Sequence, residues 1–106
     1  MNELDLTDRV NLAVRAHVRP GVRFPEVVWV GEEVRLRLWA IQAADVARAL
    51  GIGIGLPLGM ELSEVGVKTS VAAEVDGVEM LQVSERYALR FVAMLEEADR
   101  ARRHRL

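Results

Sequence analysis

Two segments of the chain alternate apolar and polar residues, which is the pattern of strands with one buried face. They are VVWV at residues 27–30 and VRLRLWAI at residues 34–41, with GEE at residues 31–33 between them. Two strands joined by so short a glycine-containing link predict a β-hairpin. The two-residue period separates Arg35, Arg37 and Trp39 on one face from the expected core residues Val34, Leu36 and Leu38.

A second hairpin is predicted where residues 65–75 and 78–83 flank Asp76-Gly77, the strongest short-range hairpin signal in the chain. Such a hairpin after a short helix is typical of a wing. Acidic residues at its tip would be repelled by DNA phosphates, so a protein partner is an alternative; they are Glu74, Asp76 and Glu79. A two-residue type I′ turn pairs Val75 with Val78, Ala73 with Met80 and Ala72 with Leu81.

Helical periodicity replaces alternation in two other segments. The first covers residues 43–50, with Asp45 expected in its first turn and Gly51 closing its end. The second begins after a predicted Ser84 cap and continues to about Arg103. The expected buried residues are Val46, Ala47, Ala49 and Leu50 in the first helix, and Ala88, Phe91, Val92, Leu95 and Ala98 in the second.

Residues 6–19 fit either a strand or one helical face. A cap at Thr7-Asp8 and a stop at Pro20-Gly21 favour the helix slightly. His17 lies in this segment, and with no companion Ser, Cys or His nearby we interpret it as a surface imidazole rather than an acid or base.

GIGIGLPLG at residues 51–59 has the spacing of a phosphate loop but lacks its Lys and Ser or Thr. A recognition helix would begin here in a helix-turn-helix protein, yet residues 52–60 carry no side chain that reads base edges. The segment is too rich in glycine to bury its own apolar residues, so we expect a homodimer that covers Ile52, Ile54, Leu56 and Leu58.

Composition bounds the remaining classes. With 106 residues, 51% hydrophobic and 28% charged, the chain is expected to form one domain over residues 1–106, with an N-terminal extension at 1–24 and a basic tail at 96–106. No apolar run approaches the ~20 residues of a membrane span, and a cytoplasmic location is expected. The chain has no Cys and two His, and no Ser-His-Asp, Cys-His or paired-carboxylate set stands out, so we expect no metal, no cofactor and no enzyme.

The net charge of −2 is unevenly distributed, because residues 38–85 hold only Arg48 and Lys68 as basic residues while the C-terminus is rich in arginine. Arginines on one strand face and along the last helix could contact phosphates, although a solvated face or a favourable helix end also explains them. The candidate nucleic-acid-binding residues are Arg35, Arg37, Arg86, Arg90, Arg100, Arg102, Arg103 and Arg105.

The order of these elements resembles the BRO-N domain of phage antirepressors and baculovirus BRO proteins over residues 27–95. The resemblance is carried by an Ala-Asp-Val…Leu-Gly helix after a strand with an aromatic residue, and by a strand leading into a helix that holds a tyrosine. The matching residues are Trp39, Asp45, Gly51, Glu85 and Tyr87.

The resemblance implies a phage- or prophage-type regulator that binds nucleic acid or a repressor. The expected fold is α+β, a small winged-helix-like domain with two β-hairpins and a long C-terminal helix. The alternative function is a protein-interaction module or host-factor inhibitor that uses the acidic and apolar middle of the chain.

Overall fold

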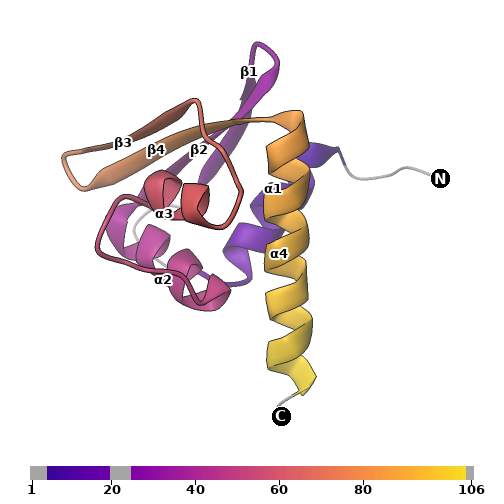
Figure 1. Ribbon diagram of the computed structural model, residues 1–106. Coiled ribbons are helices and arrows are strands. Elements are labelled where there is room, and N and C mark those ends of the chain that lie inside the picture. Colours follow the sequence, from indigo (N-terminus) through magenta and orange to yellow (C-terminus); the bar gives the residue numbers. More distant parts are fainter. Residues whose placement is uncertain (1–4, 20–24, 105–106) are drawn as a thin grey trace.

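The protein is a mixed α+β domain of four helices and four strands in the part that the computed structural model describes, residues 5–19 and 25–104. The elements follow one another along the chain as shown in Figure 1. Their bounds are α1 (Leu6–Arg15), β1 (Glu26–Val30), β2 (Glu33–Trp39), α2 (Ala40–Leu50), α3 (Leu58–Glu64), β3 (Val71–Val75), β4 (Val78–Ser84) and α4 (Glu85–His104).

The four strands form one antiparallel sheet in the order β1-β2-β4-β3. Both predicted hairpins are therefore confirmed, and β2 and β4 join them at the centre. The register of the second hairpin is the predicted one, with Val75 opposite Val78. Its turn residues Asp76 and Gly77 have φ values of 53° and 77°, as a type I′ turn requires. Strand β3 begins only at Val71, so the predicted strand over residues 65–75 was too long.

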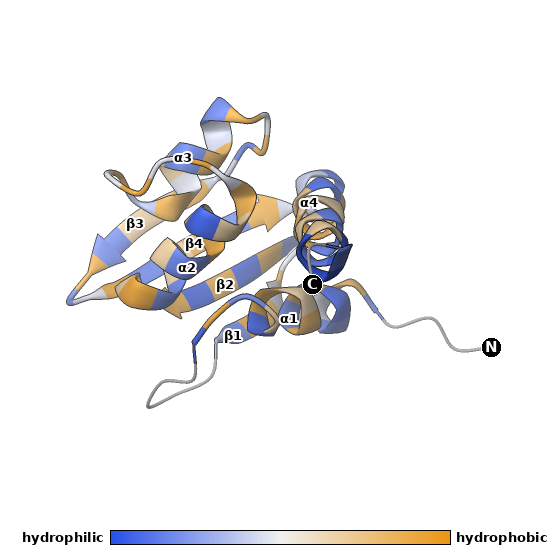
Figure 2. Cartoon of the chain, turned by 90° about the horizontal axis from the view of Figure 1, so that it is seen from below, coloured by the Kyte–Doolittle hydropathy of each residue, from blue (hydrophilic) through white to orange (hydrophobic). Residues whose placement is uncertain are grey.

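All four helices cover one face of the sheet and leave the other face open (Figures 1 and 2). The covered face carries the predicted core residues of β2 together with Leu81 and Val83 of β4, all of them buried. Helix α4 packs against α1, α2 and the two central strands through Phe91 and Val92. The sheet therefore has one face in the core and one face in solvent, as in other two-layer domains.

The two halves of the domain repeat the same order of helix, strand, strand and helix. Strands β2 and β4 pair antiparallel with Leu36 opposite Leu81 at the middle of both, which gives the topology an approximate two-fold axis at that point. Equivalent buried residues of the two halves are always the same number of residues apart in the sequence. The pairs are Leu36 and Leu81, Ala43 and Ala88, Val46 and Phe91, and Ala47 and Val92. Glu79 breaks the pattern, because its equivalent in the first half is the buried Val34.

Residues 6–15 form a helix, which decides between the two interpretations of this segment. The cap is Asp5 rather than Thr7, since the Asp5 carboxylate accepts a hydrogen bond of 2.9 Å from the backbone N–H of Asp8. Val10 and Val14 are fully buried, so this part of the expected N-terminal extension belongs to the core. The Pro20-Gly21 stop lies outside the described residues.

Helix α2 begins at Ala40, earlier than predicted. The side chain of Gln42 reaches back to accept a hydrogen bond of 3.2 Å from the backbone N–H of Trp39. Asp45 therefore lies in the second turn and not in the first, and its side chain is only 9% exposed. Gly51 closes the helix with a φ of 70°, as predicted.

Helix α3 was not predicted; it follows Pro57, which is its cap residue. The helix buries Leu58 and Leu62, and Ile52 packs partly against the core, so the glycine-rich segment does not expose all its apolar residues. Ile54 and Leu56 are 54% and 52% exposed.

Glu79 was expected at the acidic tip of the second hairpin but is buried under α3. Its carboxylate accepts a hydrogen bond from the backbone N–H of Leu58 at the start of that helix. Burial raises the pKa of Glu79, and the nearby Glu74 carboxylate, opposite it in the sheet, raises it further. This acid stabilises α3 rather than charging the surface.

The long C-terminal helix is confirmed, and α4 buries Ala88, Phe91, Val92 and Leu95 along one stripe. Ala98 is partly buried, and the helix continues to His104 through most of the expected basic tail. Among the described helices, none combines the length and apolar character needed to cross a membrane.

Candidate functional site

The predicted arginines lie in three separate places. Arg35 and Arg37 are on the open face of the sheet, where Arg37 Nη1 is 3.8 Å from Glu26 Oε1. Arg86 and Arg90 are in the first half of α4. The Arg86 guanidinium lies 5.6 Å from the ring centre of Tyr87, and Arg90 Nη2 donates a hydrogen bond of 3.2 Å to the backbone oxygen of Val65.

The third group is at the end of α4, where each described arginine meets a carboxylate about one turn before it. Arg100 is 2.7 Å from Glu97, and Arg102 and Arg103 share Asp99 at 2.7 and 3.1 Å. Arg105 lies outside the described residues. The predicted arginines that the structure describes thus do not form one face.

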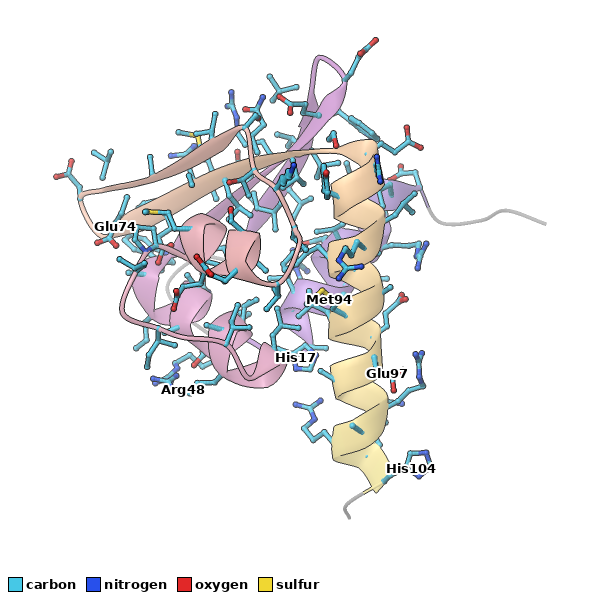
Figure 3. All side chains as sticks on the ribbon, in the orientation of Figure 1. His17, Arg48, Glu74, Met94, Glu97 and His104 are labelled. Atoms are coloured by element: carbon cyan, nitrogen blue, oxygen red, sulfur yellow. The ribbon has the colours of Figure 1, made fainter. Side chains whose placement is uncertain are left out.

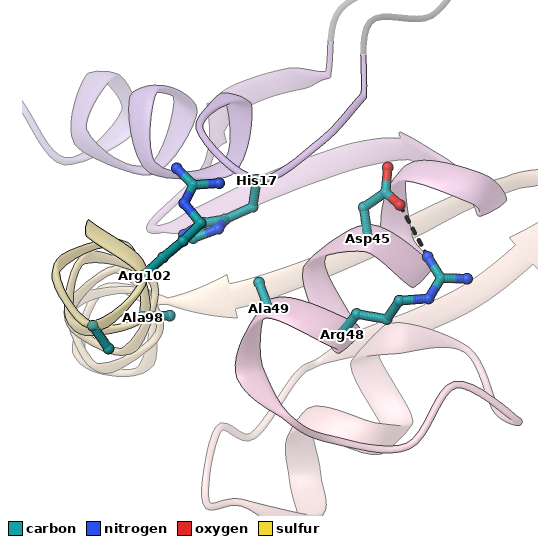
Figure 4. A pocket seen from close by; sticks show the side chains of 7 residues that line it. His17, Asp45, Arg48, Ala49, Ala98 and Arg102 are labelled. Carbon is teal, nitrogen blue, oxygen red and sulfur yellow. Dashed lines mark hydrogen bonds and ion pairs between the residues drawn. The ribbon is translucent and has the colours of Figure 1, made fainter. Parts of the chain in front are cut away.

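A cleft of about 430 Å³ brings one of these arginines together with residues that were not predicted as a site. It lies between α2, the end of α4 and the turn after α1 (Figure 4). Figure 3 shows His17 and Arg48 on the same side of the domain as the C-terminal end of α4, which carries His104. The lining residues are His17, Asp45, Arg48, Ala49, Ala98, Ala101 and Arg102.

Asp45 holds two arginines on the α2 side of this cleft. The backbone N–H of Arg19 donates to Asp45 Oδ2 at 3.0 Å, and the Arg19 guanidinium grips both carboxylate oxygens, with Nη2 at 2.7 Å from Oδ1. Arg48 Nη1 donates to the same Oδ1 at 3.0 Å. The hydrogen bonds from Arg19 and the positive charge of Arg48 hold the pKa of Asp45 below its ordinary value of 3.8.

The opposite side of the cleft is formed by Arg102 and His17. Arg102 donates one hydrogen bond to Asp99 and another, of 3.3 Å, to the backbone oxygen of Ala16. His17 Nε2 lies 3.0 Å from the backbone oxygen of Leu95, and because a carbonyl oxygen only accepts, the proton is assigned to Nε2. These contacts fix both side chains against the end of α1 and α4.

The cleft region carries a surplus of positive charge although the whole chain has a net charge of −2. Two carboxylates, Asp45 and Asp99, are shared by four arginines, which we call the arginine cluster: Arg19, Arg48, Arg102 and Arg103. Arg48 and Arg102 line the cleft itself, whereas Asp99 and Arg103 line a neighbouring hollow between α1 and α4. Each guanidinium has five N–H donors, so one carboxylate cannot satisfy two of them. Small side chains, Ala49, Ala98 and Ala101, leave room between the walls. The arrangement suits an anionic oxygen group.

Only Arg102 and Arg103 of this cluster were among the predicted binding residues. The spacing of Asp45 and Arg48 on one helix was a local signal that could have joined them. The contact between Arg19 and Asp45 has no such signal, because it depends on how the segment after α1 returns to α2.

Within the described ranges, no group of three or more His, Asp or Glu side chains is placed to hold a metal ion. Comparison of the chain with protein-family models, curated proteins and solved structures finds no match. The resemblance to the BRO-N domain therefore remains a prediction from the residues quoted above.

Proposed function

We propose that this protein is a non-catalytic, nucleic-acid-binding regulatory protein that contacts backbone phosphates through the arginine cluster. The observation that carries this proposal is the sharing of two carboxylates among four arginines, two of which, Arg48 and Arg102, line the cleft. A phosphate offers several acceptor oxygens and takes guanidinium groups in fork geometry, so it supplies the acceptors that Asp45 and Asp99 cannot.

The contacts expected here position nucleic acid without reading its sequence. Phosphate contacts carry no sequence information, and the remaining cleft wall consists of alanines and one histidine. Binding should accordingly be weak, depend steeply on salt and change little between duplex sequences. A phage-type, winged-helix-like antirepressor is the regulator that the BRO-N resemblance would imply.

A protein partner is the second candidate function, and the exposed side chains of Ile54 and Leu56 favour it. Glu74 borders the same small pocket, so an apolar surface edged by a carboxylate is presented there. Glu79 no longer contributes surface charge, because it is buried. The acidic and apolar middle of the chain is thus reduced to this smaller patch.

The two candidates are separated by measuring the affinity for a short fluorescent duplex at several salt concentrations. Combining Arg48→Ala with Arg102→Ala should flatten the plot of log affinity against log salt by about 0.9 for each phosphate that the variant no longer binds. The matched control combines Arg86→Ala with Arg90→Ala. It removes the same charge, but from the first half of α4, outside the cleft. We expect the control to keep the wild-type slope after correction for the general decrease in positive charge.

Removal of residues 100–106 is a second test of the same surface. It deletes Arg102 and Arg103 but leaves the fully buried Leu95 and Phe91 in place, so the domain should stay folded while binding weakens. No duplex binding even at low salt, or equal reductions in cluster and control variants, would move the assignment to the protein-binding patch.

A further inference from the structure

The open sheet face is a surface that no helix of the described chain covers (Figures 1 and 2). We define it by Arg35, Arg37 and Trp39 of β2 and by the residues that lie beside them in the other strands. These are Glu26 and Val28 of β1, Val78, Met80 and Gln82 of β4, and Val71, Ala73 and Val75 of β3. Apolar side chains from all four strands lie on it, among them Val28, Trp39, Val75 and Met80, and each is partly or largely exposed. An antiparallel sheet commonly keeps one face in solvent, but several exposed apolar side chains on that face mark a surface suited to a partner.

Charge on the open sheet face is balanced between acids and arginines. Arg35 and Arg37 lie in the middle of the face. Glu26 of β1 is the register partner of Arg37 of β2, and Glu33 is the first residue of β2. Glu33 Oε1 accepts hydrogen bonds of 2.9 Å from both Ser70 and Gln82, so it is held in place. Because the face carries charges of both signs, a rotated copy can set carboxylates of one chain against arginines of the other.

The arginines of this face are incompletely satisfied within one chain. Arg35 Nε is buried and has no hydrogen-bond acceptor among the described residues. Arg37 approaches Glu26 only to 3.8 Å, beyond hydrogen-bond distance. The Arg37 side chain is 51% exposed, so its donors are open to a carboxylate on a second copy.

We infer that a second copy of this chain covers the open sheet face and forms a two-fold symmetric dimer in which the two sheets pack face to face. The two-fold axis brings Glu26 and Glu33 of each copy toward Arg35 and Arg37 of the other, and Val28, Trp39 and Met80 interdigitate between the sheets. This dimer differs from the one expected from the glycine-rich segment, because Ile54 and Leu56 lie away from the interface. It does not rest on the proposed nucleic-acid binding.

The dimensions of the face limit the area that this dimer can bury. Two strands of seven residues and two of five, ~4.8 Å apart and with ~3.4 Å per residue, give a flat footprint of roughly 390 Å². Stable interfaces bury about 600–1,000 Å² of accessible surface on each partner, and a corrugated face exposes more surface than its flat footprint. Since the flat footprint lies below this range, we expect a weak dimer rather than an obligate one.

Sedimentation equilibrium over a range of micromolar concentrations tests the inference on the whole chain. Wild type should pass from monomer to dimer, and Met80→Lys should raise the dissociation constant by about 30-fold or more, because it places a charge at the centre of the face. Ile54→Lys is the matched control, being the same kind of change at an exposed apolar residue off the face. Dissociation caused by Ile54→Lys instead, or a wild type that stays monomeric throughout, would overturn the inference.

A charge exchange guards against variants that merely fail to fold. One variant carries Arg35→Glu with Arg37→Glu, and the other carries Glu26→Arg with Glu33→Arg. Each should be monomeric alone, and their mixture should form a heterodimer. If the two variants show wild-type circular dichroism but form no heterodimer when mixed, the charge pairing is wrong. It is also wrong if the open sheet face of the wild type binds single-stranded DNA but not a second copy of the chain.

Discussion

Replacing Asp45 by asparagine should weaken the fold and strengthen phosphate binding at the same time. The Asp45 carboxylate accepts hydrogen bonds from the backbone and side chain of Arg19 and from Arg48. It joins the segment after α1 to α2, and it neutralises two members of the arginine cluster. An amide of the same shape keeps one acceptor oxygen but loses the charge and half of the bidentate grip.

The decrease in stability is moderate, because one partner is well solvated. The Asp45 side chain is only 9% exposed, but the Arg19 side chain is 51% exposed, which places the pair between a surface and a buried ion pair. We expect the free energy of unfolding of Asp45→Asn to fall by roughly 1–2 kcal/mol at neutral pH. Thermal unfolding followed by circular dichroism should show a midpoint lower by about 4–8 °C for each kcal/mol.

The pH dependence of this decrease has a defined sign. The pKa of Asp45 is lowered in the folded protein, chiefly by the hydrogen bonds from Arg19, so its contribution to stability is present above its ordinary pKa of 3.8. That contribution disappears as the pH falls through the lower, folded value. Wild type and Asp45→Asn should therefore differ at neutral pH and converge in acid.

Affinity for duplex DNA should change in the opposite direction. Freeing Arg19 and Arg48 makes two guanidinium groups available, and each new phosphate contact steepens the salt slope by about 0.9. Glu97→Gln is the matched control, since it makes the same change in net charge at a residue paired with Arg100 outside the cleft. Equal increases from both variants would show that only net charge matters. Weaker binding by Asp45→Asn, measured where it is still folded, would refute the cleft as the contact.

Substitutions at Gly77 and at Glu79 test two local features of the fold. Gly77→Val should lower the free energy of unfolding, measured by chemical denaturation, by about 1–2 kcal/mol. Gly77 has a φ of 77°, and an added Cβ would meet no atom within 4 Å, so backbone strain is the only penalty. The control is Gly55→Ala, which also meets no atom within 4 Å but has no positive φ, and it should be close to neutral or slightly stabilising. Burial raises the pKa of Glu79, so its stabilising effect is greatest below its ordinary pKa of 4.5 and falls as the pH rises through the raised value. Glu79→Gln should consequently equal or exceed wild-type stability at pH 7, whereas Glu79→Ala leaves the Leu58 N–H without its acceptor and should cost about 1–3 kcal/mol. The reverse order of these two variants would contradict the structural role assigned to Glu79.

Local signals were sufficient for the parts of the fold that depend on neighbouring residues. The Asp76-Gly77 turn determined the register of its hairpin, and the apolar stripe from Ala88 to Leu95 determined the buried side of α4. Helix α3 was missed because its seven residues are too few for a helical period to stand out beside Pro57. Glu79 had a signal in its two-residue spacing from Leu81, but a carboxylate in the core is stabilised only by a partner from another element.

The candidate site was predictable only in part, since it is built by tertiary contacts. The sequence showed that arginines gather near the end of α4, and two of them belong to the cluster. It could not show that residues 16–19 return to the helix pair formed by α2 and α4, which adds His17 and Arg19 to the site. Arg35 and Arg37 share a face as predicted, but that face carries charges of both signs.

The central claim is that the arginine cluster is the surface that meets phosphates, and an NMR titration of the labelled protein with a short duplex tests it most directly. We expect amide and side-chain signals to shift at His17, Arg19 and Arg48 and across residues 98–104, and these shifts should disappear as salt is raised. Signals of Met80 and of strands β3 and β4 should stay where they are. Shifts confined to the open sheet face or to residues 52–57, or no shifts at low salt, would contradict the claim.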